Sequence, residues 1–334
     1  MATQQTQFAQ QLTCYSAKPR LYIYRSIFFA LCLYIFLQSG FAFSALSEDP
    51  DQCTASDAPT SFLSLQYQKL EHELTQNVFG EPMILSSEVG DNYAQGEVYV
   101  LLNTPFIELD AMLSQPAKWC ELAILHQNIK TCTHGKNETG EDQVQLYVGR
   151  KHYQEPSNAF PAKYLFEVDN KGRFSLDVKL SASKGPLGTY NYLIDLEAIP
   201  IDDQHSFVRF QYRYQYGFWA DVAMKTYLAT LGRNKVGFTS TGKDENGEPV
   251  YIKGLQGVVE RNVMRYIFAI QSVLEASKSP EESRQIAQLM RWYAHISKHP
   301  KQLVSLTREE YLDNKKREVE NQKAAQKSGV QTEE

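Results

Sequence analysis

Apolar and polar residues alternate with a period of two over a long central part of this chain. Five segments show the alternation, at 143–149, 162–169, 173–182, 189–199 and 206–218. A period of two places successive side chains on opposite faces of a strand, and one apolar face with one polar face is typical of an antiparallel sheet. Turn-forming sequences, DNKG at 169–172 and PIDDQ at 200–204, separate neighbouring segments. The pattern therefore predicts a sheet of consecutive antiparallel strands.

Other segments follow the helical period instead. Residues 254–277 carry an apolar face broad enough for a long buried helix, and a strand at 96–106 followed by two short helices precedes the sheet. Capping-box patterns at Ser279–Glu282 and Thr307–Glu310 predict the starts of two further helices. Residues 313–334 are charged and poor in apolar side chains, which predicts a flexible tail.

The N-terminus has the layout of a secretory signal peptide. Basic residues precede a twelve-residue apolar run, Ser26 to Leu37, and small residues follow it. The run is shorter than the ~20 residues of a membrane-spanning helix. We expect cleavage before Phe43 or Ala45 and a periplasmic protein; an uncleaved N-terminal membrane anchor is the alternative. The predicted organisation is a signal peptide (1–44), a linker with a helix (45–94), the sheet-and-helix domain (95–277), accessory helices (278–312) and the charged tail (313–334).

Charge limits the classes of partner. The chain of 334 residues has a formal net charge of -5, and its first 44 residues hold three basic residues and no acidic one, so the exported part carries -8. An acidic body without a basic face argues against nucleic acid as a partner. A small apolar ligand is compatible with this composition.

Two cysteines with a histidine between them, Cys120, His126 and Cys132, raise three alternatives. An oxidising compartment favours a Cys120–Cys132 disulfide; the others are a pairing with Cys53 and a metal or catalytic role. A zinc site needs three or four ligands at close spacing, which is not the pattern here. A single helix over twelve residues would hold the cysteines ~18 Å apart, so the disulfide requires a helix end and a turn near Gln127–Asn128.

The order of elements resembles the helix-grip fold of the START, polyketide-cyclase and birch-pollen-allergen-like proteins. The resemblance covers roughly 95–277 and rests on VYVLLNTPFIELDAML, RFSLDVKLS, YLIDLEAIP and GVVERNVMRYIFAI. It implies an α+β fold in which a curved antiparallel sheet wraps around a long C-terminal helix and encloses an apolar cavity, here with extra C-terminal helices. It also implies binding of a hydrophobic ligand without a cofactor. The insertion at 218–253, the helices after 280 and the signal peptide depart from that pattern.

Many of the predicted inward side chains are tyrosines, whose buried hydroxyls each need a partner. Two interpretations stand: a packed core between sheet and helix, or a cavity with polar groups for an amphipathic ligand. The candidate ligand-binding residues are Tyr164, Phe166, Tyr190, Tyr192, Phe210, Tyr212, Tyr214, Tyr216, Asn262 and Tyr266.

Several residues suited to chemistry have plainer explanations. The helical wheel turns Arg261 and Arg265 away from the sheet, where they would form a surface pair or contact the next helix. His295 and His299 have metal-chelating spacing, but a solvated helix face is the better interpretation without a third ligand, so we predict no metal site.

The sequence thus predicts an exported protein that binds or carries a lipid or other hydrophobic molecule, with transient membrane contact. One alternative is a cyclase- or hydrolase-type enzyme in the same cavity, using a tyrosine, Asp195 or Glu197; the alternation turns both acids toward solvent, which counts against them. The other is a non-catalytic envelope protein that docks through residues 280–320.

Overall fold

The computed structural model describes residues 61–77, 79–172, 174–230 and 233–331. The predicted signal peptide, most of the linker and Cys53 lie outside these ranges. Residues 58–334 form one compact unit. Within the described residues, no helix has both the length and the apolar content to cross a membrane.

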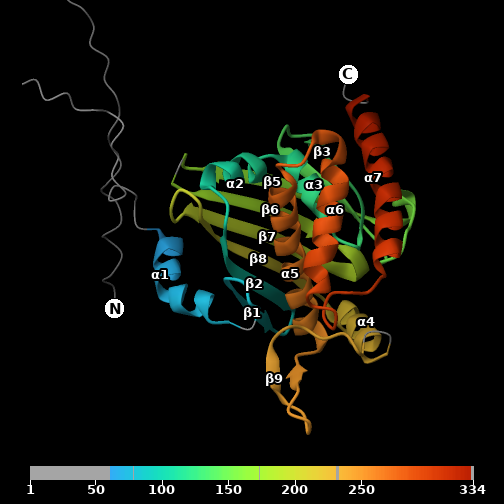
Figure 1. Cartoon of the computed structure of the whole chain (residues 1–334). Helices are drawn as coiled ribbons and strands as arrows, with labels where there is room; N and C mark the ends of the chain where they lie inside the picture. Colours follow the sequence, from blue (N-terminus) through green and yellow to red (C-terminus); the bar gives the residue numbers. More distant parts are fainter. Residues whose placement is uncertain (1–60, 78, 173, 231–232, 332–334) are drawn as a thin grey trace, which may run out of the picture. The chain divides into compact units, whose positions relative to one another are not determined.

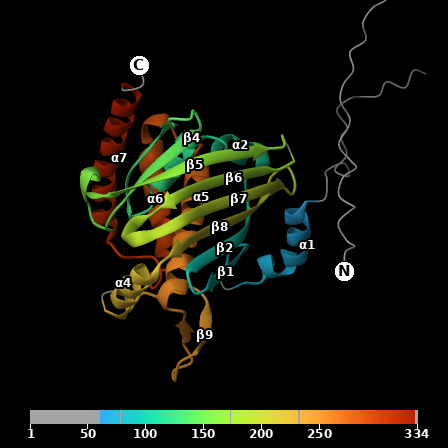
Figure 2. The ribbon, with the colours of Figure 1, turned by 180° about the vertical axis from the view of Figure 1, so that it is seen from behind.

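An eight-stranded antiparallel sheet is the centre of this unit, in the order β1-β2-β8-β7-β6-β5-β4-β3 (Figures 1 and 2). Its strands are β1 (Met83–Val89), β2 (Tyr93–Leu102), β3 (Ile129–Lys136), β4 (Asp142–Val148), β5 (Phe160–Asn170), β6 (Leu176–Lys184), β7 (Thr189–Pro200) and β8 (Ser206–Tyr216). Six consecutive strands, β3 to β8, form a meander, and the β1–β2 hairpin joins it through β2 and β8, where Val98 pairs with Phe210. The α+β class is confirmed. The strands β1 and β3 were not predicted.

Helices cover one face of the twisted sheet, with the long helix α5 (Gly254–Ala276) against β1, β2 and β8 and α6 (Glu281–Ser297) packed on α5 (Figure 1). Two short helices, α2 (Phe106–Leu113) and α3 (Pro116–Ala123), follow β2 as predicted. Gly96 on β2 permits the close approach of α5, because a Cβ there would lie 2.7 Å from a methyl group of Val263. This is the helix-grip arrangement.

The other face of the sheet is partly covered by α1 (Phe62–Thr75). Ser61 begins this helix by accepting a hydrogen bond from the Ser64 amide at 3.1 Å. Leu63 and Leu74 of α1 form a second apolar cluster with Ile199 and Phe207. This packing explains why Phe207, on the otherwise polar side of β8, is fully buried.

The insertion between β8 and α5 forms its own small structure. It contains α4 (Phe218–Ala229) and a hairpin of β9 (Ser240–Lys243) and β10 (Pro249–Tyr251). The hairpin projects from the domain in Figure 1. Two short 3-10 turns, Pro156–Asn158 and Pro186–Gly188, complete the described elements named here.

The C-terminal segment corrects the sequence analysis, because residues 308–331 form the helix α7 (Arg308–Gln331) along the edge strand β3. The Thr307–Glu310 capping box is confirmed: the Thr307 amide donates to Glu310 at 2.9 Å, and the Glu310 amide donates to the Thr307 hydroxyl at 3.2 Å. The box predicted at Ser279 is wrong, since α6 begins after Pro280 without a side-chain cap.

Two glutamines of α7 bind the exposed edge of β3. Gln322 accepts from the Cys132 amide at 3.0 Å, and Gln326 accepts from the His134 amide at 2.9 Å and donates back to the His134 carbonyl at 2.9 Å. Side-chain amides one helical turn apart thus pair with alternate residues of the strand, as another strand would. An edge strand otherwise presents unpaired N–H and C=O groups.

Charged residues bury themselves beneath α7. Glu318 is fully buried and accepts from Lys130 at 2.7 Å and from Lys315 at 2.6 Å. Lys315 also donates to the carbonyls of His126 and Ile129, both at 2.8 Å. The helix read as a flexible tail is therefore held by a buried ion-pair cluster, which a composition argument does not reveal.

Candidate functional site

The inner face of the sheet carries most of the predicted ligand-binding residues. On β8, the side chains of Phe210, Tyr212, Tyr214 and Tyr216 alternate with half-buried Arg and Gln residues that face the other way. Tyr164 and Phe166 of β5, Tyr192 of β7 and Tyr266 of α5 are buried too, and Asn262 of α5 is half-buried beside His126.

Tyrosine rings from three strands and α5 form one contact network. Tyr192 stacks on Tyr214 with ring centroids 5.4 Å apart and meets Tyr164 edge-on at 6.4 Å. Tyr266 lies 5.7 Å from Phe210 and 6.2 Å from Tyr212. The structure therefore brings the predicted aromatics together between the sheet and α5.

Tyr190 is the exception, and its predicted inward orientation is wrong. A bulge at residues 190–193 shifts the register of β7, and Asn191 there adopts a positive φ of 49°. Tyr190 consequently pairs with Lys184 and with Gln215, and Gln215 alternates with the inward tyrosines of β8. One extra residue in a strand reverses the face of those that precede it.

The hydroxyl groups of these tyrosines differ in their partners. Tyr216 donates to the Gly90 carbonyl at 2.9 Å, and Tyr192 lies 2.7 Å from the Thr189 hydroxyl. Throughout the part of the chain that the structure describes, the hydroxyls of Tyr164 and Tyr266 have no hydrogen-bond partner. Leaving such a group unpaired in an interior costs about 1–3 kcal/mol.

Small residual exposures distinguish the tyrosines from their apolar neighbours. Tyr192, Tyr212 and Tyr266 retain 7–8% of their surface, whereas Leu196 and Phe210 retain none. Burial raises the pKa of Tyr164 and Tyr212 well above the ordinary value, with neighbouring tyrosines adding to the shift. These phenols therefore stay protonated at neutral pH and can donate hydrogen bonds to a guest.

His126, from the turn before β3, borders this network in a way that the sequence did not indicate. Its ring stacks on Tyr266 at 5.5 Å, and Nδ1 accepts from the Asn128 amide at 3.1 Å. Burial lowers the pKa of His126 well below its ordinary value, and the nearby Arg265 lowers it further. The imidazole is neutral at pH 7. No spacing rule connects residue 126 to residue 266.

The acidic residues considered for an enzyme lie on the opposite face. Arg209 binds Glu97 at 2.6 Å, Glu197 at 2.8 Å and Asp195 at 3.1 Å. Burial raises the pKa of Asp195 and of Glu197, while Arg209 acts to lower both. The sheet separates these carboxylates from the tyrosine network, so they cannot act on a molecule held there.

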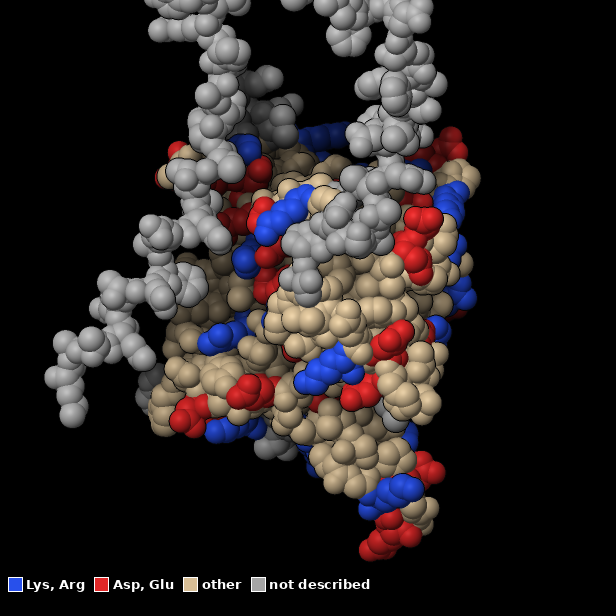
Figure 3. All heavy atoms as spheres, turned by 90° about the vertical axis from the view of Figure 1, so that its left-hand side faces the viewer, with Lys and Arg blue, Asp and Glu red and all other residues tan. Residues whose placement is uncertain are grey.

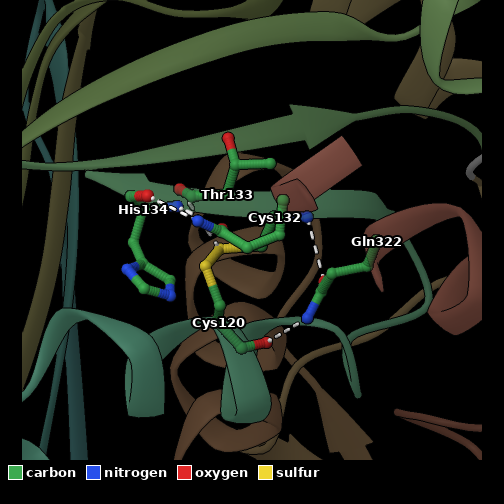
Figure 4. The surroundings of a disulfide bond; sticks show 6 residues. Cys120, Cys132, Thr133, His134 and Gln322 are labelled. Carbon is green, nitrogen blue, oxygen red and sulfur yellow. Dashed lines mark hydrogen bonds between the residues drawn. A yellow bond between two sulfur atoms is a disulfide. The ribbon is translucent and has the colours of Figure 1, made fainter. Parts of the chain in front are cut away.

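The disulfide between Cys120 and Cys132 is present and joins α3 to β3, with Cα atoms 5.2 Å apart (Figure 4). The helix α3 ends at Ala123 and the chain turns back before Ile129, which satisfies the geometric condition stated above. Gln322 of α7 lies over the bond and contacts both cysteine backbones. The His126 ring points to Tyr266 instead, so no Cys/His pair forms.

The remaining candidates belong to helix packing. Arg265 is buried and donates to the Leu303 carbonyl at 3.4 Å, and Arg261 is buried and donates to the Val236 carbonyl at 3.0 Å, so they are not a surface pair. His295 and His299 both stack on Phe268, which corrects the expected solvated face. Among the described residues, no group of three His, Cys, Asp or Glu side chains could hold a metal ion.

Comparisons with known proteins follow the same outline. No protein family description matches the sequence, and no curated protein matches it. Similar solved structures include a truncated norcoclaurine synthase from Thalictrum flavum, at 9% identity and a TM-score of 0.30 over 43% of this chain and 91% of that one. Human StAR-related lipid transfer protein 5 matches at 8% and 0.28, over 50% of this chain and 89% of that one. A conserved protein from Geobacillus kaustophilus matches at 15% and 0.31, over 55% and 96%.

The second of these comes from the group that the element order resembles. With TM-scores of 0.28–0.31, these likenesses carry no argument about the activity of this chain. The helix-grip arrangement is established by the structure described above.

Proposed function

We propose that this chain is an exported protein that binds a small amphipathic molecule, such as a lipid, between the sheet and α5. The observation that carries the proposal is the pair of interior hydroxyls, on Tyr164 and Tyr266, without a hydrogen-bond partner in the described residues. A core built only for stability would use phenylalanine at such positions, because an unpaired phenol is costly. A ligand with an apolar body and one or two polar atoms would satisfy both groups.

Binding is tested first on the whole protein. Native mass spectrometry of protein purified from its own compartment should reveal a co-purifying small molecule. After delipidation, the protein should take up a fluorescent fatty acid. A delipidated parent protein that takes up neither the natural molecule nor the fatty acid contradicts the proposal.

A pair of conservative variants locates the site. Tyr266→Phe removes an unpartnered hydroxyl, so the empty protein should keep its stability while affinity for the bound molecule falls roughly 5- to 10-fold. Tyr216→Phe is the matched control: it removes the bond to Gly90, costs about 1 kcal/mol of unfolding free energy and leaves affinity unchanged. Equal affinities in both variants would place the molecule elsewhere.

Volume changes at the same site give an independent measurement. Ala198 is fully buried on the inner face of β7, so Ala198→Trp should block uptake of the fatty acid. Tyr212→Ala should lower uptake while costing less than the ~3–5 kcal/mol of a truncation in a filled core. A full core penalty with unchanged uptake supports a simply packed interior instead.

Export is part of the proposal and has its own test. The layout of residues 1–44 supports a cleaved signal, and the Cys120–Cys132 disulfide suits an oxidising compartment such as the periplasm. N-terminal sequencing of exported protein should begin at Phe43 or Ala45. Protein in that compartment that retains residues 1–42 would contradict cleavage and support the membrane-anchored alternative.

A further inference from the structure

A second hollow lies at the base of the β9–β10 hairpin, away from the tyrosine network. Its volume is about 580 Å³, and three distant segments line it. Phe79 and Leu85 come from the entry to β1 and from β1, Phe238 and Tyr251 from the hairpin, and residues 298–302 from the loop after α6. A space of this size is in the range of small-molecule sites.

The base of the hairpin is held rigidly by Glu260 of α5. This buried carboxylate accepts hydrogen bonds from the Phe238 amide at 2.5 Å, the Thr239 amide at 3.0 Å and the Thr239 hydroxyl at 2.7 Å. It also accepts from the Ser87 hydroxyl of β1 at 2.6 Å. Three walls of the hollow are thereby fixed to one side chain, and a site fixed before binding loses little freedom when a ligand enters.

A glycine contact completes this attachment. A Cβ at Gly237 would lie 2.9 Å from the Gly257 Cα and 2.3 Å from a Glu260 carboxylate oxygen. The chain can reach Glu260 only because no side chain intervenes at residue 237. The hollow therefore depends on the 237–252 insertion being seated on α5.

Aromatic rings form the inner wall. Phe238 contacts Phe79 at 5.7 Å and the His299 ring at 5.2 Å, and His299 stacks on Phe268 at 5.6 Å. Burial lowers the pKa of His299, so its ring is neutral at pH 7, with one nitrogen that donates and one that accepts. The wall suits a flat apolar group that also carries polar atoms.

The rim is basic. Lys298 binds Glu81 at 2.6 Å, and Lys301 is exposed, with no acidic partner among the residues that the structure describes. Acidic side chains gather farther out, at the hairpin tip, which protrudes at the lower edge of Figure 3. On the face seen there, acidic and basic groups are interspersed, so the unpaired Lys301 supplies a local positive charge.

We propose that this hollow is a second binding site, for a small organic anion with an aromatic or apolar body. The body would lie against Phe79 and Phe238, and its negative group would meet Lys301 at the rim. The site is separate from the interior of the proposed function, because Glu260 and Phe268 face the hairpin and α6 while Tyr266 faces the sheet.

Anilinonaphthalene sulfonate, a fluorescent aromatic anion, is the test ligand for the full chain. We expect it to bind and to shift the His299 ring signals in NMR spectra, assigned with His299→Gln, more than those of the other histidines. Lys301→Glu should weaken binding by about tenfold through charge reversal. Lys278→Glu, the same change at an exposed lysine outside the hollow, should leave binding unchanged.

Two further measurements separate this site from the interior. Ser240→Phe, at an exposed lining position, should fill the hollow and abolish dye binding while circular dichroism stays that of the parent. Phenylnaphthylamine, the uncharged analogue, should not distinguish Lys301→Glu from the parent. Dye binding that is lost in Tyr212→Ala but kept in Lys301→Glu and Ser240→Phe overturns the proposal, as does an unmoved His299 signal.

Discussion

At the scale of single residues, the buried cluster of Lys130, Lys315 and Glu318 shows how far a side chain's role depends on distant partners. Lys130 and Glu318 are 188 positions apart, and both are fully buried. In the sequence, each is an ordinary charged residue in a polar segment. Periodicity indicates which face a residue occupies but not which charges from remote elements will meet it.

Removing the shared carboxylate should be costly. We expect Glu318→Gln to lower the free energy of unfolding by about 3–5 kcal/mol, because two buried ammonium groups lose their counter-charge. Urea unfolding measures this loss. Glu320→Gln, an exposed position two residues away, should change stability by less than about 0.5 kcal/mol. Similar small effects from both variants would show that the buried lysines do not need Glu318.

The same cluster predicts a pH dependence. Burial lowers the pKa of Lys315 to about 8, although Glu318 opposes the shift. The unfolded lysine titrates near ~10.4. Between these values the unfolded chain binds more protons than the folded protein, so stability should rise with pH from about 8 to about 10.

Urea midpoints measured across this range test the prediction, with Lys315→Met as the comparison that removes the titrating group. A parent protein whose stability is flat or falls over this interval, in parallel with the variant, contradicts the shifted pKa.

At the scale of elements, strands with one apolar face were predictable and edge strands were not. The alternation in β5, β6 and β8 follows directly from one buried and one polar side. The residues of β3, IKTCTHGK, show no such alternation, because α3 covers one side and α7 the edge. The sequence of β3 is polar since its partners are side-chain amides and a buried ion pair, and these come from a helix that itself lacks an apolar stripe.

The glutamine pairing with β3 is open to direct measurement. The double variant Gln322→Ala, Gln326→Ala should leave the amides of Cys132 and His134 without acceptors. We expect their hydrogen exchange to accelerate by at least about tenfold, which corresponds to the ~1.4 kcal/mol or more lost at each site. Lys323→Ala, on the exposed side of α7, is the control and should leave both rates unchanged.

The disulfide is the other tie between elements here. Replacing Cys120 and Cys132 by alanine should cost ~3 kcal/mol in the chain-entropy account of a loop this short. Thermal unfolding with and without reductant measures this cost. Before reduction, both cysteines should resist alkylation beneath Gln322, and free alkylation of the folded protein would contradict the bond.

At the scale of the whole molecule, the order of elements was a better guide than any single motif. It predicted the α+β class and the packing of the long helix on the sheet, because consecutive antiparallel strands have few ways to close on a helix. It could not predict the hollow beneath the hairpin, whose walls come from residues near 80, 240 and 300. Sites made from distant segments depend on the completed fold.

The pairing of β2 with β8 has a consequence for the order in which the chain folds. The strands β3 to β8 each join a sequence neighbour, whereas Val98 of β2 meets Phe210 across more than a hundred residues. Closing so long a loop is entropically costly, so contacts of this kind are slow to form. We expect the β5–β8 meander to acquire protection first and the N-terminal hairpin to dock last. In pulse-labelling hydrogen exchange, β2 amides should then gain protection after those of β6 and β7, and simultaneous protection would indicate one concerted step. An N-terminal hairpin that leaves the ribosome first would thus wait, unpaired along one edge, for a strand made much later.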